Sequence, residues 1–212
     1  MYLPDNLQNR HAVTAMVSAG SNNKSMKHLI VGLGNIGPEY DQTRHNIGFM
    51  IADALADSLK LEFKTDRYGD VAQGRLKNQQ VVILKPSTYM NLSGNAVRYW
   101  KDKENVDIKD ILVLVDDLAL PFGAIRIKPS GSDAGHNGLK NIADKLSTQA
   151  YPRLRFGIGN DFPRGCQVDY VLSRFSPAER ENMEARINLA VDAIKTTVLA
   201  GLQTAMCDFN NK

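Results

Sequence analysis

Cysteine is scarce in this 212-residue sequence, and its scarcity excludes several classes of protein. The chain has two cysteines, Cys166 and Cys207. They show neither the close spacing of a structural zinc site nor the dense, even framework of a disulfide-stabilised secreted domain. Free thiols are stable in a reducing compartment, so we expect a cytoplasmic protein without structural disulfides.

Long hydrophobic runs are also lacking. No apolar stretch approaches the roughly 20 residues that a helix needs to cross a bilayer. The segment 1–25 is polar, with several Asn and Ser residues, and it lacks the basic start and apolar centre of a secretory signal. We therefore expect a flexible N-terminal extension at 1–25, a single domain at 26–212 with Met26 as a candidate natural first residue, and no association with a membrane.

The sequence also lacks a large excess of positive or negative charge. Lysine and arginine number 26 against 23 acidic residues, a difference of three, which is compatible with a nucleic-acid partner but does not indicate one. Hydrophobic residues make up 43% of the chain, enough for the core of one globular domain. Composition therefore indicates an ordinary globular protein and leaves its function open.

The segment from Gly32 to Gly37 fits the G-x-G-x-x-G pattern and directly follows the apolar run 29–31. A dinucleotide site would need a helix to begin at this turn and an acidic residue about 20 positions later, at the end of a second strand. Pro38 would interrupt that helix, and Asp53 falls within a segment of helical spacing. The pattern therefore does not indicate a dinucleotide site, and the glycine turn needs another explanation.

Hydrophobic periodicity predicts alternating strands and helices along the chain. Strands are expected at 28–33, 70–76, 80–85, 111–115, 124–128 and 154–159, and helices at 46–60, 91–104, 137–147 and 177–201. Elements that alternate in this way form an α/β fold. We expect a single-domain three-layer sandwich in which helices flank a twisted mixed β-sheet, mixed because 70–76 and 80–85 form a predicted hairpin.

Two of these elements carry strong local signals. Residues 111–115 are continuously apolar, which is typical of a central strand covered on both faces. The helix at 177–201 is preceded by Ser176, starts with Pro177 and has Glu179 at its third position, the pattern of a capping box. A central strand and the start of the last long helix are thus predicted from local sequence.

Candidate functional residues follow several of the predicted strands. In open α/β sheets, ligands bind beyond the carboxyl ends of the strands. The candidates in chain order are Asn35 with Arg44-His45-Asn46, Met90 with Asn91, Asp116 with Asp117, and His136 with Asn137, the last pair following a strand that carries Arg126 and Lys128. We expect these four segments to meet at one edge of the sheet.

These residue types favour hydrolysis by a histidine base. The chain has no G-x-S-x-G motif and no cysteine beside a candidate base, so a covalent nucleophile is not supported. His45, His136 and Asp116 could supply three metal ligands, although no H-E-x-x-H helix supports them. A histidine can instead take a proton from water, with a carboxylate to fix its tautomer and asparagines to hold the water or a developing oxyanion. His45 is the preferred candidate for this base.

Five stretches of the sequence resemble one known family. They are LIVGLGNIGPEYDQTRHNIGFM, KPSTYMNLSGNAV, VDDLALPFGAIRIK, GSDAGHNGLKNI and YPRLRFGIGN. In this order, from about Met26 to the C-terminal helix, they closely resemble the bacterial peptidyl-tRNA hydrolases. The resemblance gives the glycine turn a role, because in that family it positions an active-site asparagine and a catalytic histidine instead of a pyrophosphate.

By position, the resemblance implies a role for each candidate residue. In the catalytic centre, His45 is the general base, Asp116 orients it, Asn35 and Asn91 hold substrate and water near the scissile ester, Asn137 stabilises the water or the oxyanion, and Met90 forms part of the apolar wall. In tRNA binding, Tyr40 lies beside the 3′ end, Lys128 and Arg155 hold the 5′ phosphate, and Arg126 falls where another basic residue is common.

The activity implied by the resemblance is hydrolysis of peptidyl-tRNA by a monomeric enzyme. Water cleaves the ester between the peptide and the terminal ribose, and a base with an oxyanion site suffices without a metal or cofactor. The product tRNA is thereby recycled. The alternative is a non-catalytic RNA-binding protein on the same scaffold, which loss of the base or its partners would indicate; these residues are all present here.

Two departures from the family pattern concern loops near the expected site. Ala119 stands where the family often has an acidic residue, and the glycine-rich lid is thinner, with the sequence PSGSDAGHNG. Neither departure involves a residue of the expected catalytic centre. We expect them to affect the flexibility and electrostatics of the loops and not the reaction.

Overall fold

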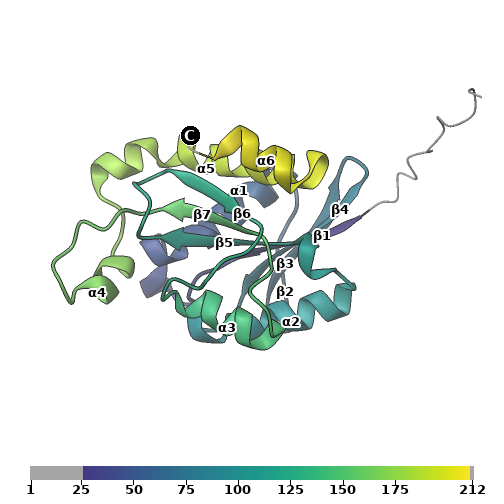
Figure 1. Cartoon of the computed structure of the whole chain (residues 1–212), viewed down its shortest axis with the longest axis horizontal. Helices are drawn as coiled ribbons and strands as arrows, with labels where there is room; N and C mark the ends of the chain where they lie inside the picture. Colours follow the sequence, from purple (N-terminus) through teal and green to yellow (C-terminus); the bar gives the residue numbers. More distant parts are fainter. Residues whose placement is uncertain (1–25, 211–212) are drawn as a thin grey trace, which may run out of the picture.

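A mixed β-sheet of seven strands forms the centre of the computed structural model, which describes residues 26–210 (Figure 1). The strand order is β2-β3-β4-β1-β5-β7-β6. The strands are β1 (Lys27–Gly32), β2 (Lys64–Asp66), β3 (Gly69–Leu76), β4 (Gln79–Pro86), β5 (Ile111–Asp117), β6 (Ile125–Lys128) and β7 (Arg153–Gly157). The extension expected at 1–25 lies outside the described residues.

The directions of the strands confirm that the sheet is mixed. The four central strands, β4, β1, β5 and β7, run parallel to one another. On one side of them, β3 pairs antiparallel with β4 and β2 pairs antiparallel with β3, so the predicted hairpin is confirmed. On the other side, β6 pairs antiparallel with β7.

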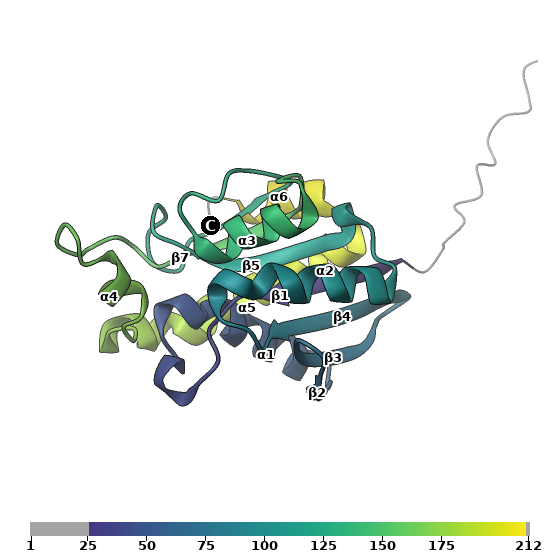
Figure 2. The same ribbon diagram turned by 90° about the horizontal axis from the view of Figure 1, so that it is seen from below.

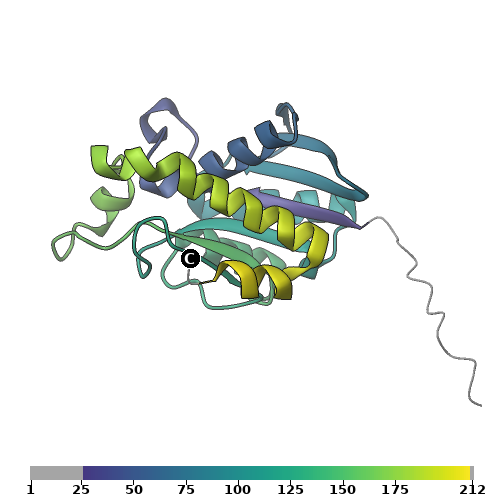
Figure 3. The ribbon, with the colours of Figure 1, turned by 90° about the horizontal axis from the view of Figure 1, so that it is seen from above.

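Helices cover both faces of the sheet, which confirms the predicted three-layer sandwich (Figures 1, 2 and 3). One face is covered by α1 (Ile47–Ser58), α5 (Pro177–Ala200) and α6 (Leu202–Phe209), and the other by α2 (Ser93–Glu104) and α3 (Asn137–Leu146). None of the helices within residues 26–210 combines the length and the apolar character of a membrane span.

Strand β5 is buried on both faces, as its continuous apolar sequence predicts. Successive strand residues point to opposite faces. Leu112 and Leu114 therefore pack with the helices α1 and α5, whereas Ile111, Val113 and Val115 pack with α2 and α3. The last two residues of the strand, Asp116 and Asp117, lie at the end of the sheet, where they line a cleft.

The first turn of α5 has the predicted capping box. Ser176 Oγ accepts a hydrogen bond from the backbone N–H of Glu179 at 3.3 Å, and the Glu179 carboxylate accepts one from the backbone N–H of Ser176 at 2.6 Å. These contacts satisfy donors that a helix N-terminus leaves without intrahelical partners. The helix ends at Gly201, whose φ of 91° lies in the left-handed region that glycine tolerates.

Short elements were missed by the sequence analysis. β2 has three exposed residues, α4 (Gln167–Val171) has five residues, and several single 3-10 turns occur, including η1 (Pro38–Tyr40), η2 (Arg44–Asn46) and η3 (Met90–Leu92). Segments this short do not establish a periodic hydrophobic pattern. The helix α6 was also missed, since only Gly201 separates it from α5.

The direction of β6 corrects one expectation. The strand at 124–128 was expected to end at the same edge of the sheet as the parallel strands. It runs the opposite way, and Lys128 lies beside Arg153 at the start of β7. The loop 129–136 therefore returns along the sheet before α3 begins. A strand direction depends on its distant partner, which local sequence does not specify.

Candidate active site

The glycine turn after β1 allows close packing against the start of α1. A side chain at Gly32 would collide with the backbone carbonyl of Gly48, and one at Gly34 would collide with the ring of Phe49. The turn leads into η1 and η2, so α1 begins only at Ile47. Close packing of β1 on α1, and not phosphate binding, accounts for these glycines.

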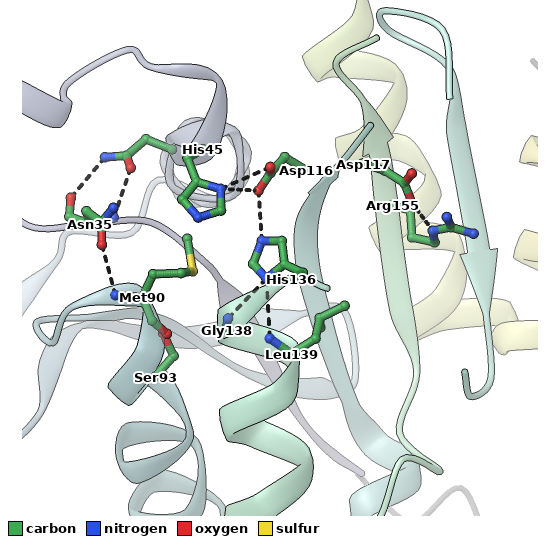
Figure 4. A network of polar contacts seen from close by, with 11 residues as sticks. Asn35, His45, Met90, Ser93, Asp116, Asp117, His136, Gly138, Leu139 and Arg155 are labelled. Atoms are coloured by element: carbon green, nitrogen blue, oxygen red, sulfur yellow. Dashed lines mark hydrogen bonds and ion pairs between the residues drawn. The ribbon is translucent and has the colours of Figure 1, made fainter. Parts of the chain in front are cut away.

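Asn35 and Asn46 fix the shape of this turn through two reciprocal hydrogen bonds. The backbone N–H of Asn35 donates to Asn46 Oδ1 at 2.9 Å, and Asn46 Nδ2 donates to the backbone carbonyl of Asn35 at 2.9 Å. The side-chain oxygen of Asn35 accepts the backbone N–H of Met90 at 2.8 Å (Figure 4). With Oδ1 engaged, the Nδ2 group of Asn35 is the donor that remains for a substrate.

Two side chains from distant parts of the chain, His45 and His136, meet the carboxylate of Asp116 at the end of β5. His45 Nδ1 lies 3.0 Å from both carboxylate oxygens of Asp116 (Figure 4). His136 Nε2 lies 3.0 Å from Asp116 Oδ1, and the two imidazole rings are 4.8 Å apart between centroids. His45 and Asp116, expected as partners from the sequence, are in contact, and the contact of Asp116 with His136 was not expected.

The tautomer of His136 follows from its position as the N-cap of α3. Its Nδ1 accepts the backbone N–H groups of Gly138 at 3.1 Å and Leu139 at 3.3 Å, so this nitrogen carries no hydrogen. The hydrogen must then reside on Nε2, which donates it to Asp116. His136 is thus a neutral side chain fixed as a donor.

Asp116 is buried, yet its surroundings favour the carboxylate. Burial by itself would raise the pKa of the Asp116 carboxyl, but the electrostatic interactions and hydrogen bonds with His136 and His45 outweigh burial and hold that pKa well below its ordinary value. Since the carboxylate only accepts hydrogen bonds, His45 must present Nδ1–H to it. The unprotonated nitrogen of a neutral His45 is therefore Nε2.

A cleft of about 590 Å³ opens beside these side chains. Among the residues proposed from sequence, it is lined by Asn35, His45, Met90, Asn91, Asp116, Lys128, Asn137 and Arg155. Tyr40 lies in η1 and Arg126 in β6, and neither is part of the cleft lining. The structure therefore brings together eight of the ten proposed residues around one cavity.

The same three residues form a group that could hold a metal ion. Ligand atoms of His45, Asp116 and His136 all lie within 4.8 Å of one another. Both ring nitrogens of His136 already serve other contacts, because Nδ1 accepts from α3 and Nε2 donates to Asp116. The hydrogen-bonding groups of His136 are therefore satisfied without an ion.

Residues that the sequence analysis left without a role complete the cleft. Besides His136, these are Asp117, which accepts a hydrogen bond from Arg155 Nε, and the residues of α4 that line one wall. Asn46, which fixes the turn, is not part of the cleft lining. The start of the helix expected at 137–147 places His136 at the N-cap position, although histidine is not among the residues that usually occupy it. No local signal connects Asp117 to Arg155, because the two residues lie on neighbouring strands.

Comparisons with known proteins agree with this geometry. The family described as peptidyl-tRNA hydrolase matches residues 29–212. Peptidyl-tRNA hydrolases of Parabacteroides distasonis and Bacteroides fragilis are 59% and 58% identical to this chain, and each match covers 88% of this chain and 100% of the relative. The crystal structure of peptidyl-tRNA hydrolase from Acinetobacter baumannii superimposes with a TM-score of 0.82 at 35% identity, covering 87% of this chain and 94% of that chain. The chain belongs to the peptidyl-tRNA hydrolase family.

Proposed function

We propose that this enzyme hydrolyses the ester bond of peptidyl-tRNA with a water molecule activated by His45. The observation that carries the proposal is the contact of His45 Nδ1 with both oxygens of the buried Asp116 carboxylate, at the side of a cleft that is also lined by asparagines. The products are a free tRNA, which is thereby recycled, and a peptide with a carboxyl terminus.

The proton path starts at Nε2 of His45. Asp116 holds the hydrogen of His45 on Nδ1, so Nε2 is free to take a proton from water as its oxygen attacks the ester carbonyl. Asp116 also stabilises the imidazolium that forms. The same proton then passes to the 3′ oxygen of the ribose when the carbon–oxygen bond of the ester breaks, which regenerates neutral His45.

The asparagines serve as neutral donors in this scheme. Asn35, with its Oδ1 held by Met90 N–H, presents Nδ2 to the substrate, and Asn91 helps to hold the substrate and the water. Asn137 at the start of α3 stabilises the water or the oxyanion. Preorganised donors of this kind stabilise charge that develops in the transition state and do not compete for the proton. Met90 contributes an apolar wall.

The tRNA is held outside this centre by basic and aromatic side chains. Lys128 and Arg155 line the same cleft as His45 and bind the 5′ phosphate, Lys as a point charge and Arg through its fork of donors. Tyr40 lies beside the 3′ end, and Arg126 adds positive charge on the adjacent strand. The enzyme acts as a monomer in the cytoplasm.

The test is hydrolysis of an N-acetylaminoacyl-tRNA by the purified protein in the presence of a chelator, followed by release of free tRNA. We expect turnover that the chelator does not change. His45→Ala should lower kcat by roughly 10² or more, the usual contribution of a general base, while tRNA affinity and the unfolding transition stay close to wild type.

Other outcomes would contradict specific parts of the proposal. Near wild-type turnover by a folded His45→Ala variant would exclude His45 as the base. Loss of activity with chelator, restored by a divalent metal, would indicate a metal at His45, Asp116 and His136. Binding of tRNA without any hydrolysis by the wild type would favour the non-catalytic alternative.

A further inference from the structure

One face of the β6–β7 pair carries four cations. In the antiparallel register, Arg126 lies opposite Arg155, and Lys128 lies opposite Arg153. Cross-strand partners and residues two apart share a face, so all four side chains project from the same side of the sheet. The residues that alternate with them along the two strands, Ile125, Ile127, Leu154 and Phe156, belong to the core on the opposite face. Like charges directly opposite one another destabilise a sheet, and an anion bound to this face would offset their repulsion.

Asp117, at the end of β5, supplies a carboxylate to this face. Arg155 Nε donates to Asp117 Oδ2, and Asp117 Oδ1 accepts the backbone N–H of Ala119 at 2.8 Å. The two charged side chains are only 17% and 9% exposed, so water and salt screen the pair weakly. Arg153, by contrast, donates to neutral backbone carbonyls. Figure 4 shows the Asp117–Arg155 contact on the far side of the β5 backbone from His45.

We propose that Asp117 is an internal counter-anion that competes with the 5′ phosphate of the substrate for Arg155, and thereby sets how strongly the enzyme prefers 5′-phosphorylated tRNA. The inference rests on the proposed function, in which Lys128 and Arg155 hold that phosphate. Asp117 neutralises a nearly buried guanidinium. A phosphate that binds Arg155 must approach this carboxylate or displace it, so Asp117 weakens the hold on substrate and on product tRNA alike.

Magnitudes decide the direction of the effect. At the effective dielectric constant of a protein, repulsion between a carboxylate and a phosphate of nearly two charges about 6 Å away corresponds to a change in binding on the order of a hundredfold or more before screening. The opposing effect is the ordering of a freed Arg155 side chain, about threefold to tenfold. Repulsion therefore dominates, and removal of the Asp117 charge should strengthen phosphate binding.

The experiment compares two forms of one substrate, an N-acetylaminoacyl-tRNA with either a 5′ phosphate or a 5′ hydroxyl group. The quantity measured is the ratio of KM for the hydroxyl form to KM for the phosphate form. Asp117→Asn removes the charge and keeps an oxygen that can accept the Ala119 N–H. We expect this variant to raise the ratio by about threefold or more, and to lower the inhibition constant of deacylated 5′-phosphorylated tRNA to a similar extent.

Two further variants separate the Asp117–Arg155 contact from a general effect of charge. Asp133→Asn removes another carboxylate of the cleft, one whose Oδ1 likewise accepts a backbone N–H, that of Gly135 at 2.8 Å. It should change the ratio less than Asp117→Asn. In Arg155→Gln, the added change of Asp117 to Asn should raise the ratio less than it does in the wild type, because the group for which the two anions compete is gone and only their direct repulsion remains. Asp117→Ser, which also keeps an oxygen acceptor, replaces Asp117→Asn if that variant does not fold.

The outcomes distinguish this inference from the proposed function. Absence of hydrolysis by the wild type would overturn both. Hydrolysis with a wild-type ratio near one would remove the phosphate clamp, and the role of Asp117 with it, but leave the catalytic proposal standing. A wild-type ratio above one that stays constant or falls in Asp117→Asn would overturn the role of Asp117 alone, as would an equal rise in Asp133→Asn.

Discussion

Asp116 connects the proposed base to the N-terminus of α3. It accepts hydrogen bonds from His45 on one side and from His136 on the other. The His136 hydrogen is fixed on Nε2 by the backbone N–H groups of Gly138 and Leu139. Because His136 can only donate from Nε2, the side chain at position 116 must present an acceptor atom to it. The effect of a substitution at Asp116 can therefore be predicted.

Asp116→Asn should leave the fold intact and lower kcat on the order of 10³ or more. The introduced amide must offer its oxygen to the fixed Nε2–H of His136. Its NH2 group then faces His45 Nδ1 and favours the tautomer with hydrogen on Nε2, which cannot take a proton from water. Single-turnover kinetics on N-acetylaminoacyl-tRNA, with unfolding in urea as the control, measure this. A variant that keeps more than a tenth of the wild-type rate would contradict the assigned tautomers.

His28 should make stability depend on pH. Burial lowers the pKa of this imidazole, and the nearby Asp110 carboxylate only partly offsets the effect. The unfolded chain therefore binds more protons than the folded chain as pH falls through the ordinary histidine range near 6.5, so the free energy of unfolding decreases toward lower pH. Urea unfolding at pH 5.5 and 7.5 should show a smaller difference for His28→Gln than for the wild type. An unchanged difference would assign the pH dependence to other groups.

At the scale of elements, the start of α5 is joined to the turn that carries the base. Arg44, directly before His45, donates from Nη2 to Glu179 at 2.8 Å and from Nη1 to Ser173 Oγ at 3.0 Å, and its guanidinium lies 4.4 Å from the ring centroid of Tyr170. Glu179 also closes the capping box. One carboxylate thus serves both the helix terminus and the arginine beside the site.

Ser176→Ala should cost about 1 kcal/mol of folding free energy, the usual effect of losing an N-cap side chain. The contact between Glu179 and Arg44 does not involve Ser176, so kcat/KM should stay within about twofold of wild type. Urea unfolding and kinetics on the same preparation measure both quantities, with Ser176→Thr as the control that keeps the hydroxyl. A tenfold or larger loss of activity at unchanged stability would show that the cap itself positions the site.

At the scale of the whole molecule, the two helical layers enclose the sheet and leave the cleft at one end. β1 begins at Lys27, and the residues that line the cleft lie between Asn35 and Leu172. A chain that begins at Met26 should therefore unfold at the same urea concentration as the full chain and hydrolyse substrate with the same kcat and KM. A several-fold rise in KM on truncation would show that 1–25 contributes to binding tRNA.

Local sequence was sufficient to predict most helices and strands and most residues of the candidate site. Apolar periodicity placed the longer helices and six of the seven strands, because burial on one or two faces imposes a repeat that extends over many residues. The capping box at Ser176 and Glu179 is a local contact, so its pattern sufficed to predict it. The resemblance of five motifs then identified His45 and Asp116 as partners, and the structure places them 3.0 Å apart.

Tertiary structure decided which distant groups meet and in which direction the strand β6 runs. The antiparallel course of β6 follows from its pairing with β7, and the meeting of Asp117 with Arg155 follows from the pairing of β5 with β7. His136 reaches Asp116 only because the loop 129–136 returns along the sheet. Such contacts join residues whose separation in sequence carries no periodic signal, and they are fixed by strand register and by the packing of whole layers.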